Sequence, residues 1–124
     1  MKFYICEHCG NVITKLISKG VPVHCCGQAM TELKAGVTDA AVEKHVPAVS
    51  VDSGIVRVNV GSVTHPMTEE HSILWVAVET ERDALIHWLN PGEAPEAVFA
   101  LADDQQAKAV YAYCNLHGLW KAEV

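Results

Sequence analysis

Four cysteines lie close to the start of the chain, at a spacing that suits a single metal ion. Cys6 and Cys9 form a C-x2-C pair, and Cys25 and Cys26 follow after 15 further residues, with no spacer between them. A C-x2-C pair grips an ion from one turn, and a second pair completes a tetrahedron. Adjacent side chains tend to point apart, so we expect backbone strain where both sulfurs of the C-C pair face the same ion.

This segment is expected to form a metal-dependent domain of residues 1–36. It is rich in cysteine and glycine and too short to bury a core, so metal binding would supply its folding free energy. Zinc and iron both occupy four-thiolate sites, and spacing alone leaves open a structural zinc or a redox iron. His8 and His24 stand beside the cysteines, but four sulfurs already complete the site. Residues 34–42 are then predicted to form a linker.

Residues 37–124 are expected to form a β-sandwich. Valines at every second position flank Asp52-Ser53-Gly54 and predict a hairpin with one buried face. Residues 73–79 and 85–89 predict strands, and Asn90-Pro91-Gly92 predicts a turn. Residues 94–113 are ambiguous, because their alanines favour a helix whereas 98–101 and 110–113 could be strands. The number of other strands favours an antiparallel sandwich and hence strands here.

A second group of potential ligands lies in this β-rich part. Cys114 and His117 share the motif C-N-L-H, and the other members are His45 in E-K-H-V-P, His65 in H-P-M and His71 in E-E-H. Each histidine taken alone is more often an ordinary surface or core residue than a ligand. Their turn-like and strand-edge contexts are typical of loops that converge at one end of a sandwich. Together they predict a second metal site.

The donor set of this second site favours iron. Four imidazoles and one thiolate are too many for the tetrahedron that zinc prefers, but they suit iron with a sixth position open. A thiolate opposite an open position pushes electron density toward whatever binds there, which favours chemistry with a small oxygen species. His87, flanked by Ile86 and Trp88 inside a predicted strand, lacks a loop context and is left out of the site.

Net charge limits the partners of this chain. The chain has a net charge of −6, with only nine lysines and arginines and no basic run, so we do not expect nucleic acid as a partner. The same charge repels anions at long range, and an anionic substrate would need a local cationic group. Lys44, beside His45, is the candidate for that group.

The chain is expected to be cytoplasmic and not membrane-bound. It contains no run of about 18 apolar residues and no signal-like segment before Cys6. Five cysteines, an odd number, are then better interpreted as metal ligands or catalytic thiols than as disulfides.

Five motifs together resemble one known family. F-Y-I-C-E-H-C-G-N, C-C-G-Q-A-M, E-K-H-V-P, H-P-M-T-E-E-H and Y-C-N-L-H-G-L-W-K are similar in order and spacing to those of the desulfoferrodoxins, the two-iron superoxide reductases. The resemblance covers essentially the whole chain. It implies a desulforedoxin-like domain with iron in four cysteines, followed by an immunoglobulin-like β-sandwich with a mononuclear non-haem iron.

The resemblance also implies ligands, a reaction and partners. Four histidines would surround the catalytic iron in a plane, with a cysteine as axial ligand; the matching positions are His45, His65, His71, His117 and Cys114. The implied reaction is one-electron reduction of superoxide to hydrogen peroxide, with two protons taken up. Glu43 matches the carboxylate that binds the ferric iron, and Lys44 would attract the anion. A rubredoxin-like protein would donate electrons, and the family usually forms homodimers.

Two other functions remain open from the sequence. A non-enzymatic electron carrier would use the four-cysteine iron alone and bind one iron per chain, whereas a reductase binds two. A zinc-ribbon interaction module would need only the C-x2-C and C-C pairs. Neither alternative accounts for the joint occurrence of C-N-L-H, H-P-M and E-K-H-V-P.

Overall fold

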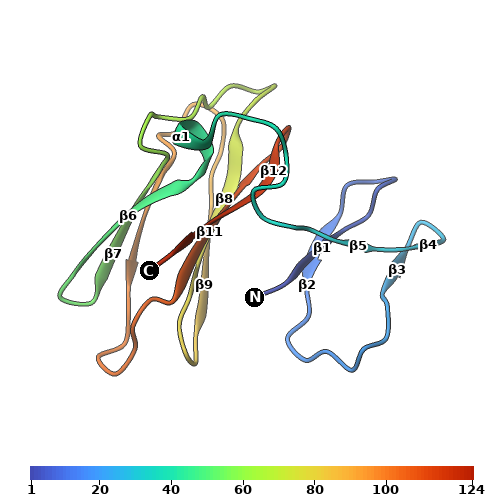
Figure 1. Ribbon diagram of the computed structural model, residues 1–124, viewed down its shortest axis with the longest axis horizontal. Helices are drawn as coiled ribbons and strands as arrows, with labels where there is room; N and C mark the ends of the chain where they lie inside the picture. The colour runs from blue at the N-terminus through green and yellow to red at the C-terminus, as the bar shows by residue number, and fades with distance from the viewer. The chain divides into compact units, whose positions relative to one another are not determined.

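The computed structural model describes residues 1–124 as two compact units, Met1–Lys34 and Ala35–Val124. Almost all of the regular structure in both units is β-strand (Figure 1), so the predicted mainly β fold class is confirmed. The structure contains no helix with the length and apolar character needed to span a bilayer.

The first unit is built from very short strands. Strands β1 (Phe3–Ile5), β2 (Val12–Thr14) and β5 (Thr31–Glu32) form a three-stranded sheet in the order β2-β1-β5, and β3 (His24–Cys25) pairs with β4 (Gln28–Ala29). Of its side chains only Phe3 and Cys6 are buried, whereas Leu16 and Ile17 are exposed. Such a unit has almost no hydrophobic core, which agrees with the expectation that a metal ion stabilises it.

The second unit is an antiparallel sandwich of seven strands. One sheet has the order β10-β7-β6 and the other β12-β11-β8-β9. The strands are β6 (Pro47–Asp52), β7 (Ile55–Val60), β8 (Ile73–Glu79), β9 (Ala84–Trp88), β10 (Glu96–Ala100), β11 (Ala109–Cys114) and β12 (Gly118–Glu123). Three strands packed against four is the arrangement of an immunoglobulin-like domain, as predicted.

The predicted hairpin is the pair β6–β7. Asp52 pairs with Ile55, which leaves Ser53 and Gly54 as a two-residue loop. Both have positive φ, 50° and 79°, the backbone that a tight hairpin turn of type I′ requires. Strand β8 has the predicted bounds, and the ambiguous residues 94–113 contribute strands β10 and β11, as the sandwich requires.

Helix α1 (Val42–His45) was not predicted. Residues 34–42 were expected to form a linker, but this one-turn helix begins at its end. Helix propensity is uninformative for four residues, because a single turn is stabilised by its surroundings rather than by its own hydrogen bonds. This turn carries three of the candidate site residues.

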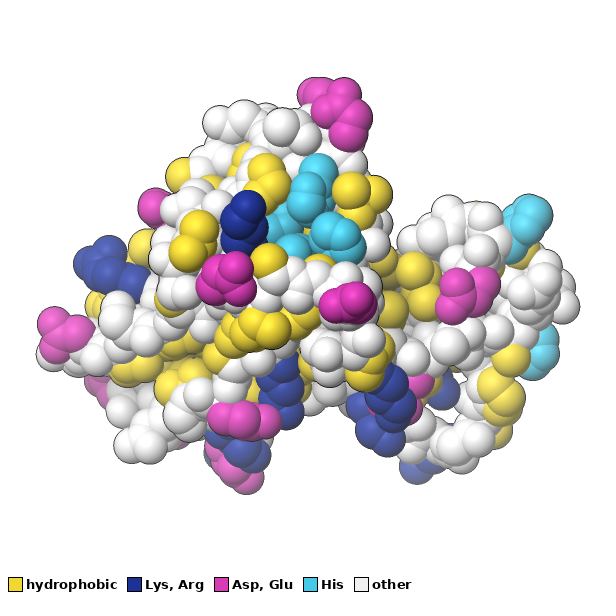
Figure 2. Space-filling model, turned by 45° about the horizontal axis from the view of Figure 1, so that its top comes forward, with side chains coloured by type: hydrophobic (Ala, Val, Ile, Leu, Met, Phe, Trp, Pro, Cys, Tyr) yellow, Lys and Arg dark blue, Asp and Glu magenta, His cyan; other side chains and the backbone are white.

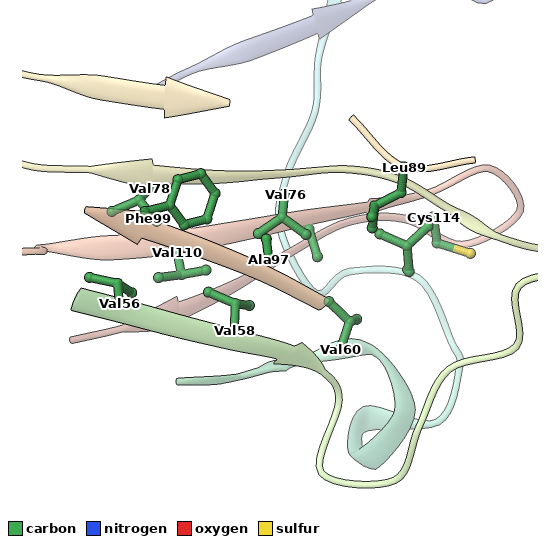
Figure 3. Close-up of a cluster of buried hydrophobic side chains, with 12 residues drawn as sticks. Val56, Val58, Val60, Val76, Val78, Leu89, Ala97, Phe99, Val110 and Cys114 are labelled. Atoms are coloured by element: carbon green, nitrogen blue, oxygen red, sulfur yellow. The ribbon is translucent and has the colours of Figure 1, made fainter. Parts of the chain in front are cut away.

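The core lies between the two sheets of the sandwich. Valines at alternate positions of β7 and β8 point inward and meet β10 and β11 (Figure 3). The buried cluster consists of Val56, Val58, Val60, Ile73, Val76, Val78, Leu89, Ala97, Phe99, Val110, Ala112 and Cys114. Cys114 is thus both a core residue and a candidate ligand, so the hydrophobic core ends at the candidate metal site.

Neighbouring residues of β10 provide a test of this core. Phe99 is 6% exposed between the sheets, whereas Val98 beside it is 56% exposed on the outer face. Phe99→Ala should lower the free energy of unfolding of the sandwich by about 3–5 kcal/mol, because it leaves a cavity as well as losing apolar contacts. Val98→Ala should change it by less than about 0.5 kcal/mol. Denaturant unfolding of both variants measures the difference, and equal effects would contradict the inward orientation of Phe99.

Candidate metal centres

The four N-terminal cysteines lie together in the first unit. Their sulfur atoms are all within 4.8 Å of one another, and Cys9 Sγ is 3.6 Å from Cys25 Sγ. The backbone N–H of Cys9 lies 3.4 Å from Cys6 Sγ and is the main cause that lowers the pKa of that thiol to about 6. No histidine belongs to the cluster, so His8 and His24 lie outside it, as expected.

The C-C pair reaches the cluster through unusual backbone. Cys26 has φ of 54°, in the left-handed region, and the following Gly27 has φ of 74°. A non-glycine residue in this region costs roughly 1–2 kcal/mol. The strain expected from the missing spacer is therefore located at Cys26, where the left-handed turn directs two adjacent sulfurs to the same side.

The second cluster is assembled at one end of the sandwich. His45 ends α1, His65 and His71 lie in the connection between β7 and β8, and Cys114 ends β11. The ligand atoms of these four side chains lie within 4.8 Å of one another. His117, in the turn between β11 and β12, joins them through Nδ1, which is 3.1 Å from His45 Nε2 and 3.9 Å from Cys114 Sγ. All five candidate ligands therefore meet.

Two of the imidazoles are oriented by backbone carbonyls. His45 Nδ1–H donates to the carbonyl of Ala41 at 2.7 Å, and His65 Nδ1–H donates to the carbonyl of Pro66 at 2.6 Å. A carbonyl only accepts, so Nδ1 of each ring carries the proton. In each neutral ring the lone pair is then on Nε2, and this atom points into the cluster.

The arrangement of these nitrogens fits a cation. His45 Nε2 and His65 Nε2 are 3.1 Å apart. Burial lowers the pKa of His65 to about 4 and also lowers the pKa of His45, so both rings are neutral near pH 7. Two lone pairs at this distance repel each other unless a cation lies between them. His71 Nε2 is buried without a hydrogen-bond partner, as expected of a ligand atom.

The buried sulfur fits the same interpretation. Burial raises the pKa of the Cys114 thiol, and backbone N–H groups of Leu116 and His117 act in the opposite direction. A thiolate is stable in this position only beside a positive charge, which a metal ion supplies. Four nitrogen donors and one sulfur donor suit iron better than a tetrahedral zinc.

The histidine cluster reaches the surface of the sandwich, with a basic and an acidic side chain beside it (Figure 2). Glu43 and Lys44 are exposed residues of α1, directly before His45. Burial is the main cause that lowers the pKa of His71, and the positive charge of Lys44 contributes to the shift. Lys44 therefore lies within electrostatic reach of the cluster.

Helix α1 is held in place by the loop after β7. The carbonyl of Glu43 accepts hydrogen bonds from Val63 N–H at 2.8 Å and from Ser62 Oγ at 3.2 Å. Gly61 approaches so closely that a Cβ would lie 2.7 Å from the same carbonyl. Sequence reasoning missed this contact, although a glycine at the end of a strand pattern is a signal for a close backbone approach.

His87, which the sequence analysis left out of the site, lies on β9 near Phe99 and outside the cluster.

The fold and these clusters define a class of protein, in which a small thiolate-rich unit precedes an immunoglobulin-like sandwich with a nitrogen-rich metal site in its loops. The family model described as desulfoferrodoxin matches residues 37–123. The chain belongs to the desulfoferrodoxin family.

Several relatives match over most of their length. The desulfoferrodoxin of Nitratidesulfovibrio vulgaris is 43% identical over 122 residues, which cover 98% of this chain and 95% of that protein. The crystal structure of the superoxide reductase from Treponema pallidum matches with a TM-score of 0.82 and 37% identity, over 98% of both chains. A one-iron superoxide reductase from Giardia intestinalis matches with a TM-score of 0.58 and 31% identity, over 66% of this chain and 97% of its own.

Proposed function

We propose that this protein is a superoxide reductase that works at the His-Cys centre of its sandwich. The observation that carries the proposal is the meeting of four imidazoles and a buried thiol beside the exposed Lys44. Relatives named superoxide reductase support it, both among curated proteins and among solved structures. The reaction takes up one electron and two protons per superoxide and yields hydrogen peroxide.

Iron is the metal proposed for this centre. His45, His65, His71, His117 and Cys114 would hold it, and when bound it would supply the single electron that superoxide needs. The carbonyls of Ala41 and Pro66 keep the donor nitrogens of two of these rings directed inward. Glu43 is proposed as a further, reversible ligand of the oxidised iron, since it lies two residues before His45 on the same turn.

Lys44 is proposed to attract the substrate. Superoxide is an anion and the chain carries a net charge of −6, so the long-range field of the protein is repulsive. A cation beside the cluster reverses this field locally. Its ammonium group can also order a water molecule that delivers protons from solvent.

Replacement of Lys44 tests the electrostatic role. Lys44→Ala should lower the second-order rate with superoxide by about 3- to 10-fold at low ionic strength, and it should weaken the salt dependence of that rate. Lys108→Ala is the matched control, since Lys108 is also exposed but lies at the opposite end of β11 and contacts Glu81. Pulse radiolysis at several salt concentrations measures both. Equal rates for the two variants would remove Lys44 from the mechanism.

The first centre is proposed to hold a second iron, with zinc as an alternative occupant of the four thiolates. Residues 1–36 would form this iron domain and residues 37–124 the reductase domain. The one-iron relative from Giardia is covered almost completely by two thirds of this chain. This coverage supports an auxiliary role for the first centre, either structural or in electron relay. We further propose a rubredoxin-like electron donor, a homodimer and a cytoplasmic location.

Iron counting and one kinetic measurement test the proposed function. Purified protein should contain two metal ions per chain, and its oxidised form should show a sulfur-to-iron band from Cys114 separate from the bands of the four-cysteine site. That band should disappear on reduction and return after a pulse of superoxide. One iron per chain and no second band would favour an electron carrier; zinc alone in the four-cysteine site would favour an interaction module.

A further inference from the structure

Asn115 connects the two loops that carry Cys114 and His71. Its side-chain Nδ2 donates to the carbonyl of Glu70 at 2.9 Å, and its Oδ1 accepts from the backbone N–H of Ser72 at 3.0 Å. Its backbone N–H donates to the carbonyl of Ser72 at 3.1 Å. One residue next to the sulfur ligand thus binds the chain immediately before and immediately after a nitrogen ligand.

His71 depends on such support more than two other imidazoles of the cluster. A backbone carbonyl within 2.7 Å orients the rings of His45 and His65, whereas no hydrogen bond holds the ring of His71. Besides its edge contacts with the rings of His65 and His117, this ring is positioned by the backbone of residues 70–72. Loss of an outer partner that orients a ligand commonly lowers metal affinity 10- to 100-fold.

The strand pairing at this point is irregular, which gives the side-chain contacts more weight. The β8–β11 register shifts between Tyr113 and Cys114, and Cys114 pairs with Ile73. Regular ladder hydrogen bonds therefore do not extend to His71. Ser72 is buried, so its N–H group needs the partner that Asn115 Oδ1 provides.

Thr68 holds His71 from the other side, within its own loop. Thr68 Oγ1 accepts from the backbone N–H of His71 at 3.0 Å, and the Thr68 N–H donates to the His71 carbonyl at 2.9 Å. This contact closes the turn of residues 68–71 but does not join it to Cys114. Asn115 is the side chain that makes that join.

We propose that Asn115 is a positioning residue of the second centre, which sets the place of the His71 imidazole relative to the Cys114 sulfur. The inference rests on the proposed function in assuming that a metal occupies this centre. It adds a role for a residue that binds neither metal nor substrate.

The test uses full-length, iron-loaded protein and the variant Asn115→Leu, which keeps the approximate shape but removes both side-chain hydrogen bonds. We expect the affinity of the second centre for iron, measured by competition with a chelator, to fall about tenfold. We also expect its sulfur-to-iron band to move, while the bands of the four-cysteine site, measured in the same sample, stay unchanged. Unchanged affinity and an unmoved band would overturn the proposal.

Gln105→Leu is the matched control for loss of stability alone. Gln105 Oε1 accepts from Thr80 Oγ1 at 2.8 Å and from the N–H of Arg82 at 3.1 Å, so this amide also bridges two segments. It lies at the opposite end of β11 from Cys114. This variant should unfold more easily but keep the iron affinity and the band. The same loss of affinity in Gln105→Leu would reduce Asn115 to a general stabilising residue and overturn the proposal.

Asn115→Ala provides a second variant if the leucine side chain prevents folding. Its iron affinity and its sulfur-to-iron band then test the proposal in the same way.

The outcomes of this test can be distinguished from those of the proposed function. Wild-type protein that binds iron at the second centre but does not reduce superoxide would disprove the reductase and leave the role of Asn115 intact. A wild type that reduces superoxide, together with an Asn115 variant whose iron affinity and band are unchanged, would overturn the role of Asn115 and leave the reductase intact.

Discussion

Cys114→Ser should abolish superoxide reduction, lowering the rate by at least about 100-fold, since loss of an outer partner of a ligand already costs 10- to 100-fold. The thiol is the one sulfur donor of the second cluster and is buried at the end of the core. Serine is nearly isosteric, but its hydroxyl is a far weaker donor to iron and does not ionise in this position. The imidazoles and the core packing stay in place, so the loss would reflect the missing thiolate.

Two measurements separate this effect from misfolding. The sulfur-to-iron band of the second centre should be absent from Cys114→Ser, whereas the bands of the four-cysteine site should remain. Cys9→Ser is the opposite control, because it removes one of the four N-terminal thiols and leaves the second cluster complete. It should keep its reactivity with superoxide when reduced chemically. Full activity in Cys114→Ser would exclude the second cluster as the reaction centre.

Removal of metal from the four-cysteine site should unfold residues 1–34. This unit has two buried side chains and strands of two or three residues, and a structural metal contributes on the order of 10 kcal/mol to the folding of comparable small domains. Without a metal the four thiols do not ionise alike, because hydrogen bonds from the Cys9 and Cys6 side chains raise the pKa of Cys26 to about 12, whereas the backbone N–H of Cys9 lowers that of Cys6. A cation removes this difference by binding all four as thiolates.

Amide hydrogen exchange of metal-free and metal-loaded protein measures this prediction. Protection of β1, β2 and β5 should be lost without metal, whereas β7, β8 and β11, which pack around the valine core, should stay protected. Sustained protection of β1 in the metal-free protein would show that the first unit folds without its ion. The same experiment on Cys9→Ser avoids any effect of the chelator on the second centre.

The class of fold and the first four strands of the sandwich, β6 to β9, could be predicted from the sequence because they depend on short-range patterns, whereas strand β12 was not predicted. Alternating valines placed β6 and β7 around Ser53-Gly54, and strand β8 has the predicted bounds. Residues 94–113 could not be settled locally, since their composition suits a helix as well as a strand. Pairing of β10 with β7 and of β11 with β8 decided the outcome. Tertiary pairing overrides weak propensities of this kind.

The candidate ligands show the same division. The cysteine and histidine motifs identified which side chains could bind metal, because ligand chemistry belongs to the residue type and chelation by C-x2-C or C-N-L-H acts over a few residues. Nothing in the sequence indicates the carbonyls of Ala41 and Pro66, which choose the donor nitrogen of two imidazoles. Every residue has a backbone carbonyl, so the residue types do not reveal which carbonyls orient a ligand. The link from Asn115 to residues 70 and 72 also depends on packing, since loops far apart in the chain meet only after the sheets have formed.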